Sequence, residues 1–476
     1  MSGVTEPPRP AGGEESGWAE NREDYAQDRV PLPYRQWSTV SLFGVMFGIT
    51  TAMFFLSWGG TLVLAYGTKT LVIGMVIAGL VIGGLAYAWS KKASATGLGA
   101  DLMSRSSGFG YYGSAVTSLI YTLTFLMFFA FEGSIMANAI HTQWPSIPKA
   151  AIYVFTGVVI IPLTWYGMRL MNVLMWVTLP IYAVFLVITI VEAAHTGRTV
   201  DFWSYVPAHT ATPEAGPALL QVLAAALAVL SQVTISADMG RFIPPQRRTS
   251  GALIVGFFSQ ILTFVGCGIL GGWLTLRFGV SDPGAYLPQI MGAWGVLFVI
   301  ITQIRINVTN IYSGSIIYST LFTRIFRFSP GRHWWVVLTT ALGTALMFGD
   351  IYSRLNQVLT FEAVFIIAWV MAVVADMFVI KRWLKLVPDD SPYERHELRR
   401  YNPVGLIAVG IALVVAVPMS FGLAGPLGIT LAPFVSGVLS FVVTPIVALA
   451  TRGRYYAPEG ARTEEVAAAT PEPAAD

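Results

Sequence analysis

The sequence predicts an all-α polytopic membrane protein, and three observations lead to this fold class. The chain of 476 residues is 55% hydrophobic and only 12% charged, and its mean hydropathy is +0.63. Soluble proteins rarely combine so many apolar residues with so few charges. Twelve apolar runs are long enough to cross about 30 Å of hydrocarbon as helices. Lys and Arg are concentrated in alternate loops between these runs.

The twelve predicted transmembrane helices lie within residues 36–450. Residues 1–35 form a polar tail that lacks the apolar segment of a cleavable signal peptide. Residues 451–476 form a second tail rich in Ala, Pro and Glu, and we expect both tails to be disordered. The predicted spans are, in order, 40–66, 68–90, 111–140, 149–168, 172–195, 216–236, 251–277, 289–321, 334–349, 360–380, 403–421 and 428–450.

The distribution of basic residues predicts the orientation of the chain. If both termini share one side of the membrane, that side holds 23 of the 29 Lys and Arg residues and the other side holds five. The remaining one is Arg305. Basic residues favour the cytoplasmic side, so we expect both termini there, in a multi-pass protein of the cytoplasmic membrane. The net charge of +3 is then explained by topology and indicates no nucleic-acid partner.

Two spans contain unusual numbers of small and polar residues. The first includes Gly48, Thr51 and Ser57, and the sixth includes the polar run 231–240. Interrupted helices five spans apart are typical of transporters built from two inverted repeats, in which a midplane site uses exposed backbone and half-helix ends. We therefore expect repeats over about 36–195 and 216–380, followed by two extra helices over 403–450. Close helix packing by small residues is the alternative explanation.

Two charged residues lie deep inside predicted spans. Glu132 lies in the third span and Arg305 in the eighth. A charge at membrane depth is costly unless it is paired or faces a polar cavity, so both residues are candidates for a functional site. A structural ion pair between them is the alternative. Asp238, Glu362 and Asp376 lie nearer to span ends, where we expect structural roles, either at a solvated helix end or in an ion pair with a loop.

The sequence contains no pattern that indicates an enzyme, a cofactor or a metal site. The run Gly266–Gly271 has the G-x-G-x-x-G spelling of a dinucleotide site, but it lies inside an apolar span without a preceding strand. The five histidines lack metal-ligand spacing, and no nucleophile has a base nearby in sequence. The single cysteine, Cys267, is expected to be a buried packing residue. We therefore expect neither a membrane enzyme nor a receptor with a soluble domain.

Several segments together resemble the nucleobase:cation symporter-1 family, and within it the bacterial cytosine and purine-cytosine permeases. The resemblance covers residues 30–450, and the order and spacing of the segments make it specific. The segments are Met46-Phe-Gly48 with Trp58-Gly-Gly60, the loop from Thr96-Gly97 to Tyr112-Gly-Ser114, Ser236-Ala-Asp238-Met-Gly-Arg241, and Asn307 through Tyr312-Ser313.

The resemblance implies a LeuT-like fold with ten core helices in two inverted repeats plus two C-terminal helices. It also implies a secondary active transporter that imports a nucleobase or related heterocycle, such as a purine, cytosine, allantoin or a hydantoin, by alternating access. In the family the substrate lies between the first, third, sixth and eighth helices. Carried over to this sequence, the contact positions are Met53, Phe54, Phe128, Glu132, Val229, Ser231, Gln232 and Asn307.

The chain departs from the family pattern at three of these positions. Related permeases usually have tryptophan at the position of Phe128, often an aromatic residue at Val229, and an uncharged residue at Glu132. The aromatic contact with a flat base is therefore expected to be weaker here. A carboxylate accepts hydrogen bonds from amino and ring N–H groups, so Glu132 favours basic or amine-bearing substrates. An amino-acid or organic-amine transporter on the same fold is the alternative function.

The expected ion site departs as well. In sodium-coupled relatives, carbonyls near Gly48 and Thr51 and two hydroxyls of the eighth helix bind the ion, and those hydroxyl positions correspond to Arg305 and Ile306. A guanidinium has no lone pair for sodium and repels it. We therefore expect Arg305 to occupy this site as a tethered cation that meets free carbonyls of the first helix. Transport would then be sodium-independent and driven either by protons, with Glu132 as the candidate proton carrier, or by the substrate gradient alone. Nothing in the sequence indicates subunit symmetry, so a monomer in the lipid bilayer is compatible with it.

Overall fold

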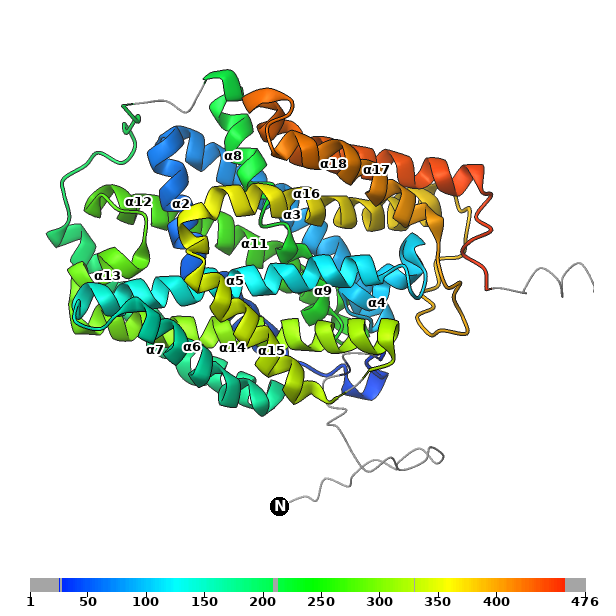
Figure 1. The fold of residues 1–476 in the computed structure, drawn as a ribbon, viewed down its shortest axis with the longest axis horizontal. Coiled ribbons are helices and arrows are strands. Elements are labelled where there is room, and N and C mark those ends of the chain that lie inside the picture. Colours follow the sequence, from blue (N-terminus) through cyan, green and yellow to red (C-terminus); the bar gives the residue numbers. More distant parts are fainter. Residues whose placement is uncertain (1–24, 26–27, 209–212, 329, 459–476) are drawn as a thin grey trace, which may run out of the picture.

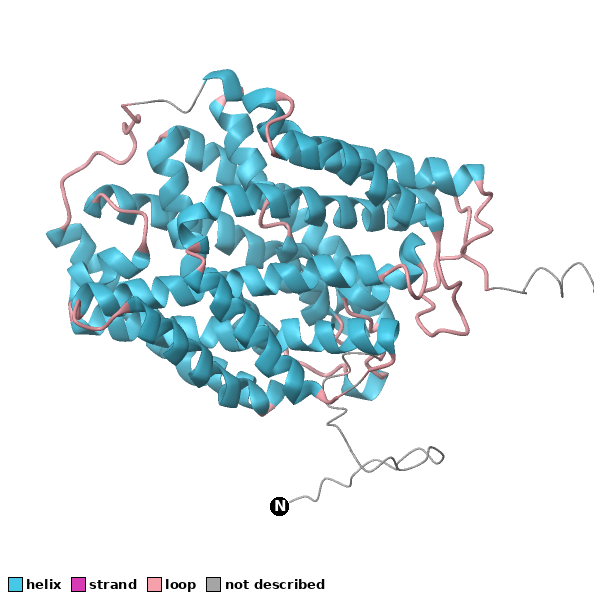
Figure 2. Ribbon diagram, viewed as in Figure 1, coloured by secondary structure: helices cyan, strands magenta, loops and turns pink. Residues whose placement is uncertain are grey.

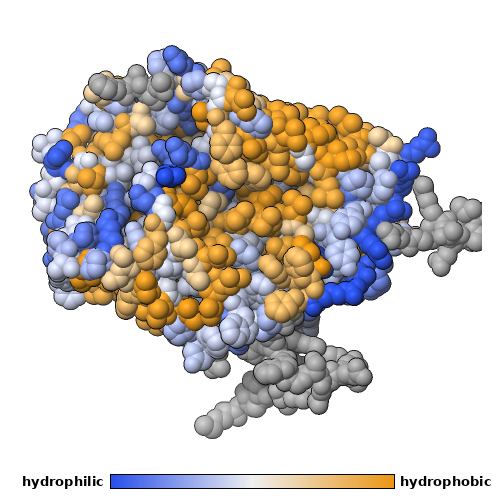
Figure 3. All heavy atoms as spheres, in the orientation of Figure 1, coloured by the Kyte–Doolittle hydropathy of each residue, from blue (hydrophilic) through white to orange (hydrophobic). Residues whose placement is uncertain are grey.

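The structure is a computed structural model that describes residues 25, 28–208, 213–328 and 330–458. Within these residues every regular element is a helix, and the long helices run side by side (Figures 1 and 2). A broad apolar band crosses the middle of the molecular surface, with hydrophilic residues toward both ends of the helices (Figure 3). This is the surface of a protein that spans a bilayer, with the helix axes across the membrane.

Each of the twelve predicted spans corresponds to helical structure. In chain order the helices are α1 (Thr39–Thr50) with α2 (Met53–Tyr66), α3 (Thr68–Thr96), α5 (Ala115–Gln143), α6 (Lys149–Trp165), α7 (Gly167–Thr196), α8 (Ala218–Leu227) with α9 (Ser231–Gly240), α10 (Arg248–Ala252) to α12 (Ile269–Phe278), α14 (Ala293–Phe326), α15 (Arg332–Phe348), α16 (Leu355–Val374) with the π-helix η9 (Ala375–Trp383), α17 (Pro403–Ser420) and α18 (Gly425–Ala450). The short helices α4 (Ala100–Ser104) and α13 (Pro283–Met291) lie in loops.

Length and apolarity alone support fewer than twelve crossings. Nine helices of the described part meet both criteria, or ten if the bent pair α1 and α2 is one span. The helices α6 and α15 have 17 residues each, just short of what a perpendicular crossing needs. The count of twelve therefore stays a prediction.

The first span is broken as predicted, whereas the sixth is interrupted only locally. α1 and α2 meet at a bend of 48°. Ala52 adopts an extended conformation there, which ends the α-helical hydrogen bonding. In the sixth span, the N–H groups of residues 228–230 each bond to a carbonyl three residues earlier. This tight turn allows 218–240 to continue as one span.

α17 and α18 form a pair that packs on the flank of α16 (Figure 1). The hydroxyls of Ser436 and Ser440, one turn apart on α18, donate to the carbonyls of Val364 and Ala368 on α16 at 2.7 and 2.6 Å. These bonds attach the two C-terminal helices to the rest of the bundle through α16.

Both ends of the described chain lie on one face of the bundle, which we call the terminal face. Arg29 donates to the carbonyl of Ser391 at 2.9 Å, and Arg399 donates to the carbonyl of Ala457 at 3.1 Å. The loop 384–402 therefore holds both ends. Residues 28–35 and 451–458 of the two predicted tails lie against the bundle, and the rest of the tails falls outside the described residues.

Candidate functional site

Arg305 is a buried charge that reaches the break between α1 and α2. Its side chain extends from α14, is 1% exposed, and donates from Nη2 to Oγ1 of Thr51 at 3.1 Å. The guanidinium carbon lies 4.8 Å from the ring centroid of Tyr182, a cation–π contact from α7. Gly48 leaves room for the packing here, because a Cβ at this position would lie 2.5 Å from Sδ of Met175.

We expected Arg305 to bond to free backbone carbonyls of the first helix. In the structure it bonds to the side-chain hydroxyl of Thr51 instead. The hydroxyl of Thr51 donates to the carbonyl of Phe47 at 2.6 Å and accepts from Arg305. It therefore links the guanidinium to a carbonyl at the C-terminal end of α1 through two hydrogen bonds. The neighbouring carbonyl of Thr50 accepts from the thiol of Cys267 at 3.5 Å. Cys267 is buried, as predicted, and also bonds to the end of this helix.

Glu132 approaches the other side of the same break. It lies on α5, is 1% exposed, and accepts from the N–H of Phe54 at 3.3 and 3.4 Å to its two carboxylate oxygens. Phe54 is in the first turn of α2, where free N–H groups and the helix dipole favour a negative charge. The Gln303 side chain lies beside the carboxylate.

The two buried charges thus match the two helix ends that meet at the break. Arg305 bonds to the C-terminal end of α1 and Glu132 to the N-terminal end of α2. Within the described residues no ion pair within 4.0 Å joins them, so the alternative of a direct structural pair is not what the structure contains. Each charge is stabilised by a half-helix, and both line the broken backbone.

The remaining predicted contact residues are all buried, but they do not form one continuous cluster of direct contacts. Phe128 meets Phe54 edge to face, with ring centroids 5.0 Å apart. Met53 belongs to a second apolar cluster that also contains Tyr182 and Tyr286. Ile306 and Val229 belong to the main apolar core.

Several buried polar atoms around these helices lack a hydrogen-bond partner in the described structure. They include Oγ of Ser231, Oε1 of Gln232, Nδ2 of Asn307, and Nε and Nη1 of Arg305. Asn307 otherwise accepts from Asn310 at 3.4 Å. Buried polar atoms without partners are costly, and a polar ligand or water can satisfy them. Glu362 is another buried carboxylate of this kind, contrary to the solvated or paired position that we expected.

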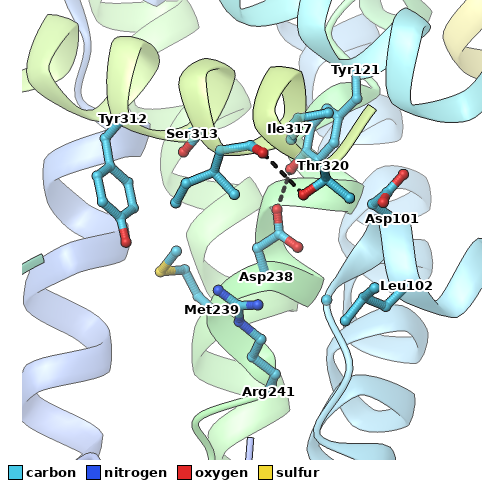
Figure 4. Close-up of a pocket in the computed structure, with 12 residues that line it drawn as sticks. Asp101, Leu102, Tyr121, Asp238, Met239, Arg241, Tyr312, Ser313, Ile317 and Thr320 are labelled. Atoms are coloured by element: carbon cyan, nitrogen blue, oxygen red, sulfur yellow. Dashed lines mark hydrogen bonds between the residues drawn. The ribbon is translucent and has the colours of Figure 1, made fainter. Parts of the chain in front are cut away.

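Two small cavities follow α14 from the region of Arg305 toward the terminal face. The first, about 10 Å³, is lined by Ile306 and Asn310, among others, and has room for about one water molecule. The second, about 50 Å³, is lined by Ile317 and Thr320 on α14. Ser313 lines both cavities, so both lie along the same face of α14. Figure 4 shows the residues around the second cavity.

A polar network closes this path near the terminal face. Tyr121 on α5 donates to Oδ2 of Asp238 on α9 at 2.6 Å (Figure 4), and the N–H of Ala100 on α4 donates to Oδ1 at 2.8 Å. Beside it, Arg324 on α14 pairs with Asp101 on α4 at 2.8 Å. These bonds tie the four helices α4, α5, α9 and α14 together beside the second cavity.

Replacing Tyr121 by Phe is expected to destabilise this closed arrangement. The change removes the donor to Oδ2 of Asp238 and leaves a buried acceptor unpaired, which costs about 1–3 kcal/mol. The thermal unfolding midpoint of the purified protein should fall accordingly. Tyr318→Phe is the matched control, because the ring of that buried tyrosine stacks on Trp335 in an apolar cluster. Equal midpoints for the two variants would contradict a closing role for the Tyr121 hydroxyl.

A second polar network lies on the face opposite the terminal face. Asp282 caps α13, accepting from the N–H of Gly284 at 2.8 Å and from Nδ2 of Asn138 on α5 at 2.6 Å. Tyr352 lies near this carboxylate and hydrogen-bonds to Ser57 on α2 at 2.7 Å. These contacts connect α2, α5 and α13 at the face opposite the terminal face.

Asp282 should give the protein a pH-dependent stability. Burial raises the pKa of this carboxyl from 3.8 to about 6, against the opposing effects of its hydrogen bonds and Lys149. The folded protein therefore holds a proton that the unfolded chain releases near pH 4. The free energy of unfolding should fall by up to about 3 kcal/mol as the pH rises from about 4 to about 6.

Thermal unfolding at several pH values measures this effect. Asp282→Asn keeps the cap and should remove the decline, whereas Asp201→Asn, at an exposed carboxylate of the same face, should retain it. An unchanged pH profile in Asp282→Asn would show that another group is responsible.

Sequence reasoning identified the two buried charges but missed most of their partners. Tyr182 and Gln303 occupy apolar spans in which a single aromatic or amide residue gives no signal. Tyr121 and Asp282 take part in bonds between helices that are distant in sequence, and only the fold brings those helices together. Asp101 and Arg324 carry opposite charges near the ends of predicted spans, and this could have suggested that they pair.

Comparisons with known proteins agree with this architecture. A family model described as permease for cytosine/purines, uracil, thiamine and allantoin matches residues 29–443. No curated protein matches the chain. The fold resembles an inward-facing structure of Mhp1, with a TM-score of 0.68 and 17% identity over 91% of this chain and 97% of that one.

Two further solved structures share the fold. One is Mhp1, a nucleobase-cation-symport-1 family transporter, in a closed conformation with bromovinylhydantoin bound (TM-score 0.67, 15% identity, 89% and 96% of the two chains). The other is a substrate-bound, outward-open Na⁺-coupled sialic acid symporter (TM-score 0.60, 12% identity, 90% and 91%). The predicted LeuT-like architecture is thereby confirmed.

Proposed function

The chain belongs to the nucleobase:cation symporter-1 family of permeases for cytosine, purines, uracil, thiamine and allantoin, and from this premise we propose that it imports a nitrogenous heterocycle rich in N–H donors. Purines, cytosine and allantoin- or hydantoin-like rings have this chemistry. The family membership supports a nucleobase-type substrate. The residues at the α1–α2 break support the narrower choice among such substrates.

The observation that carries the proposal is the position of Glu132. Its carboxylate is buried at the N-terminal end of α2, and the ring of Phe54 in the same turn meets the ring of Phe128. A substrate with amino or ring N–H groups would donate to the carboxylate and contact an aromatic ring. The unpaired atoms of Ser231, Gln232 and Asn307 are candidates for further polar contacts.

We propose that transport does not require sodium. The guanidinium of Arg305 already bonds to Thr51 at the end of α1, next to the backbone that would have to bind the ion. A fixed positive charge at that point repels a second cation and offers no lone pair. Glu132 is then the group that carries a proton with the substrate.

Alternating access would use the two closed ends of the path. We propose that the terminal face is cytoplasmic, in keeping with its excess of Lys and Arg, and that substrate leaves along α14 when the Tyr121–Asp238 bond opens. The network around Asp282 would open toward the other side.

Ligand-dependent thermal stabilisation of the purified protein tests the substrate class. Nucleobases, hydantoins, allantoin and thiamine would each be compared with aliphatic amines and amino acids, with and without sodium. The proposal is supported if a heterocycle raises the unfolding midpoint by the same amount with and without sodium. Stabilisation by amines or amino acids alone favours the alternative substrate class, and dependence on sodium removes the proposed role of Arg305.

A further inference from the structure

A large cavity at the terminal face lies apart from the candidate site. Its volume is about 1440 Å³, above the roughly 300–1,000 Å³ that is common for small-molecule sites. The walls come from α3, from α10, from η9 with the loop that follows it, and from Arg29 near the N-terminal end. The cavity thus lies where membrane-spanning helices meet the loop 384–402.

The cavity is strongly basic. Seven basic and three acidic residues line it. Asp389 is paired with Lys92 at 2.6 Å, and Glu397 accepts from the N–H groups of Tyr393 and Glu394 at 3.1 Å. Lys381 pairs with Asp376 outside the cavity lining. Five of the lining cations have no ion-pair partner among the described residues, namely Arg29, Lys91, Arg248, Arg382 and Lys385.

The unpaired cations come from separate walls. Lys91 lies at the end of α3, Arg248 begins α10, and Arg382 is in η9. Mutual repulsion would disfavour bringing such charges around one cavity unless an anion compensates them. Both Arg248 and Arg382 are exposed, so their guanidinium groups are free to reach an anion that enters the cavity.

One wall of the cavity continues into the apolar surface of the protein. Leu80 and Val81 on α3 are 51% and 56% exposed within the membrane-spanning part. Gly84, Ala88 and Lys91 follow at helical spacing and line the cavity. An apolar stripe on the lipid-facing side of α3 therefore leads directly into a basic cavity. A soluble anion has no apolar group to pack against this stripe, whereas the acyl chain of a lipid would lie along it.

We propose that this cavity binds the phosphate of an anionic lipid headgroup, with an acyl chain of the same lipid along the exposed stripe of α3. The cations from α3, α10 and η9 surround the phosphate. Because guanidinium groups match phosphate oxygens in geometry, Arg248 and Arg382 provide directional bonds and the lysines provide charge. The site is independent of substrate binding at the α1–α2 break.

Thermal unfolding of the full chain in neutral detergent, with lipid added stepwise, tests this site. Phosphatidylglycerol should raise the unfolding midpoint and phosphatidylcholine should not. In the double variant Arg248→Gln/Arg382→Gln, half-maximal stabilisation should require about tenfold more phosphatidylglycerol. The matched control Arg327→Gln/Arg400→Gln removes two exposed cations of the terminal face outside the cavity lining and should titrate like the original protein.

The alternative sources of the effect have distinct outcomes. Equal stabilisation by phosphatidylcholine, or an equal loss in the control variant, would overturn the site. A full shift with inorganic phosphate alone would overturn the lipid as the source of the phosphate. If the double variant does not fold, Arg382→Gln alone is titrated in the same way, with bound lipid counted by native mass spectrometry. Phosphatidylglycerol retention equal to that of the original protein would then contradict the proposal.

Discussion

Arg305→Met is expected to abolish transport while the protein remains folded. The substitution keeps a long side chain on α14 but removes the bond to Thr51 and the contact with the Tyr182 ring. Hydrogen bonds to charged groups contribute about 1.5–3 kcal/mol. If they hold the end of α1 in its transport-competent position, the uptake rate should fall by about 100-fold. The measurement is substrate uptake into proteoliposomes that contain equal amounts of protein.

Stability separates a functional loss from a folding defect. Arg305 has no carboxylate within ion-pair distance among the described residues, so replacing it by an apolar residue should cost little stability. The unfolding midpoint of Arg305→Met should therefore stay within a few degrees of the original value. Arg305→Lys retains the charge and should keep more activity than the Met variant. If the Arg305→Met variant took up substrate at the normal rate, this result would contradict the proposal that the Arg305 guanidinium substitutes for a coupling ion.

Glu132→Gln is expected to lower uptake by at least tenfold and to remove its dependence on pH. Glutamine has the same shape, and its side-chain oxygen can still accept from the N–H of Phe54. It cannot bind or release a proton, and it presents an N–H group where the carboxylate presents a second acceptor. Both changes weaken binding of a substrate that donates hydrogen bonds. Initial uptake rates between pH 5 and 8 (roughly the range in which liposomes stay intact) measure the effect.

Glu362→Gln provides the matched control for Glu132→Gln. Glu362 is also a buried glutamate inside a membrane-spanning helix, and the side chain of Thr124 lies beside its carboxylate. Its removal should leave the pH profile of uptake in place. If the Glu362 variant loses the profile and the Glu132 variant keeps it, the proton carrier is on α16 instead of α5.

The sequence predicted the helices well because membrane insertion imposes a strong and local requirement. A run of apolar residues long enough to cross the bilayer has few alternatives to a helix, since lipid leaves backbone groups no other partner. The break at Thr51 was also predictable, from small and hydroxyl residues inside an apolar run. The milder interruption at residues 228–230 was not, because the same residue types permit a tight turn that preserves the helix axis.

The candidate site was predictable only in part. Arg305 and Glu132 stood out because charges at membrane depth are costly. Their partners depend on which helix faces meet, and apolar spans contain too little sequence contrast to specify those faces. The expectation of carbonyl ligands for Arg305 failed because the Thr51 side chain folds back on its own helix and presents its hydroxyl instead. Local side-chain bonding of this kind leaves no periodic pattern in the sequence.

The attachment of both chain ends to the loop 384–402 has a consequence for the order of assembly during synthesis. Arg29 and Ser391 are 362 positions apart in the chain, yet they are hydrogen-bonded. A ribosome that builds the protein from its N-terminus exposes Arg29 long before it has made Ser391. In the same stretch, Val30 and Arg35 can bond to the backbone at the C-terminal end of α3 once that helix has been made, but Arg29 must wait until the tenth predicted span is complete. The contact of Arg29 with the loop 384–402 therefore forms only after most of the bundle has been synthesised.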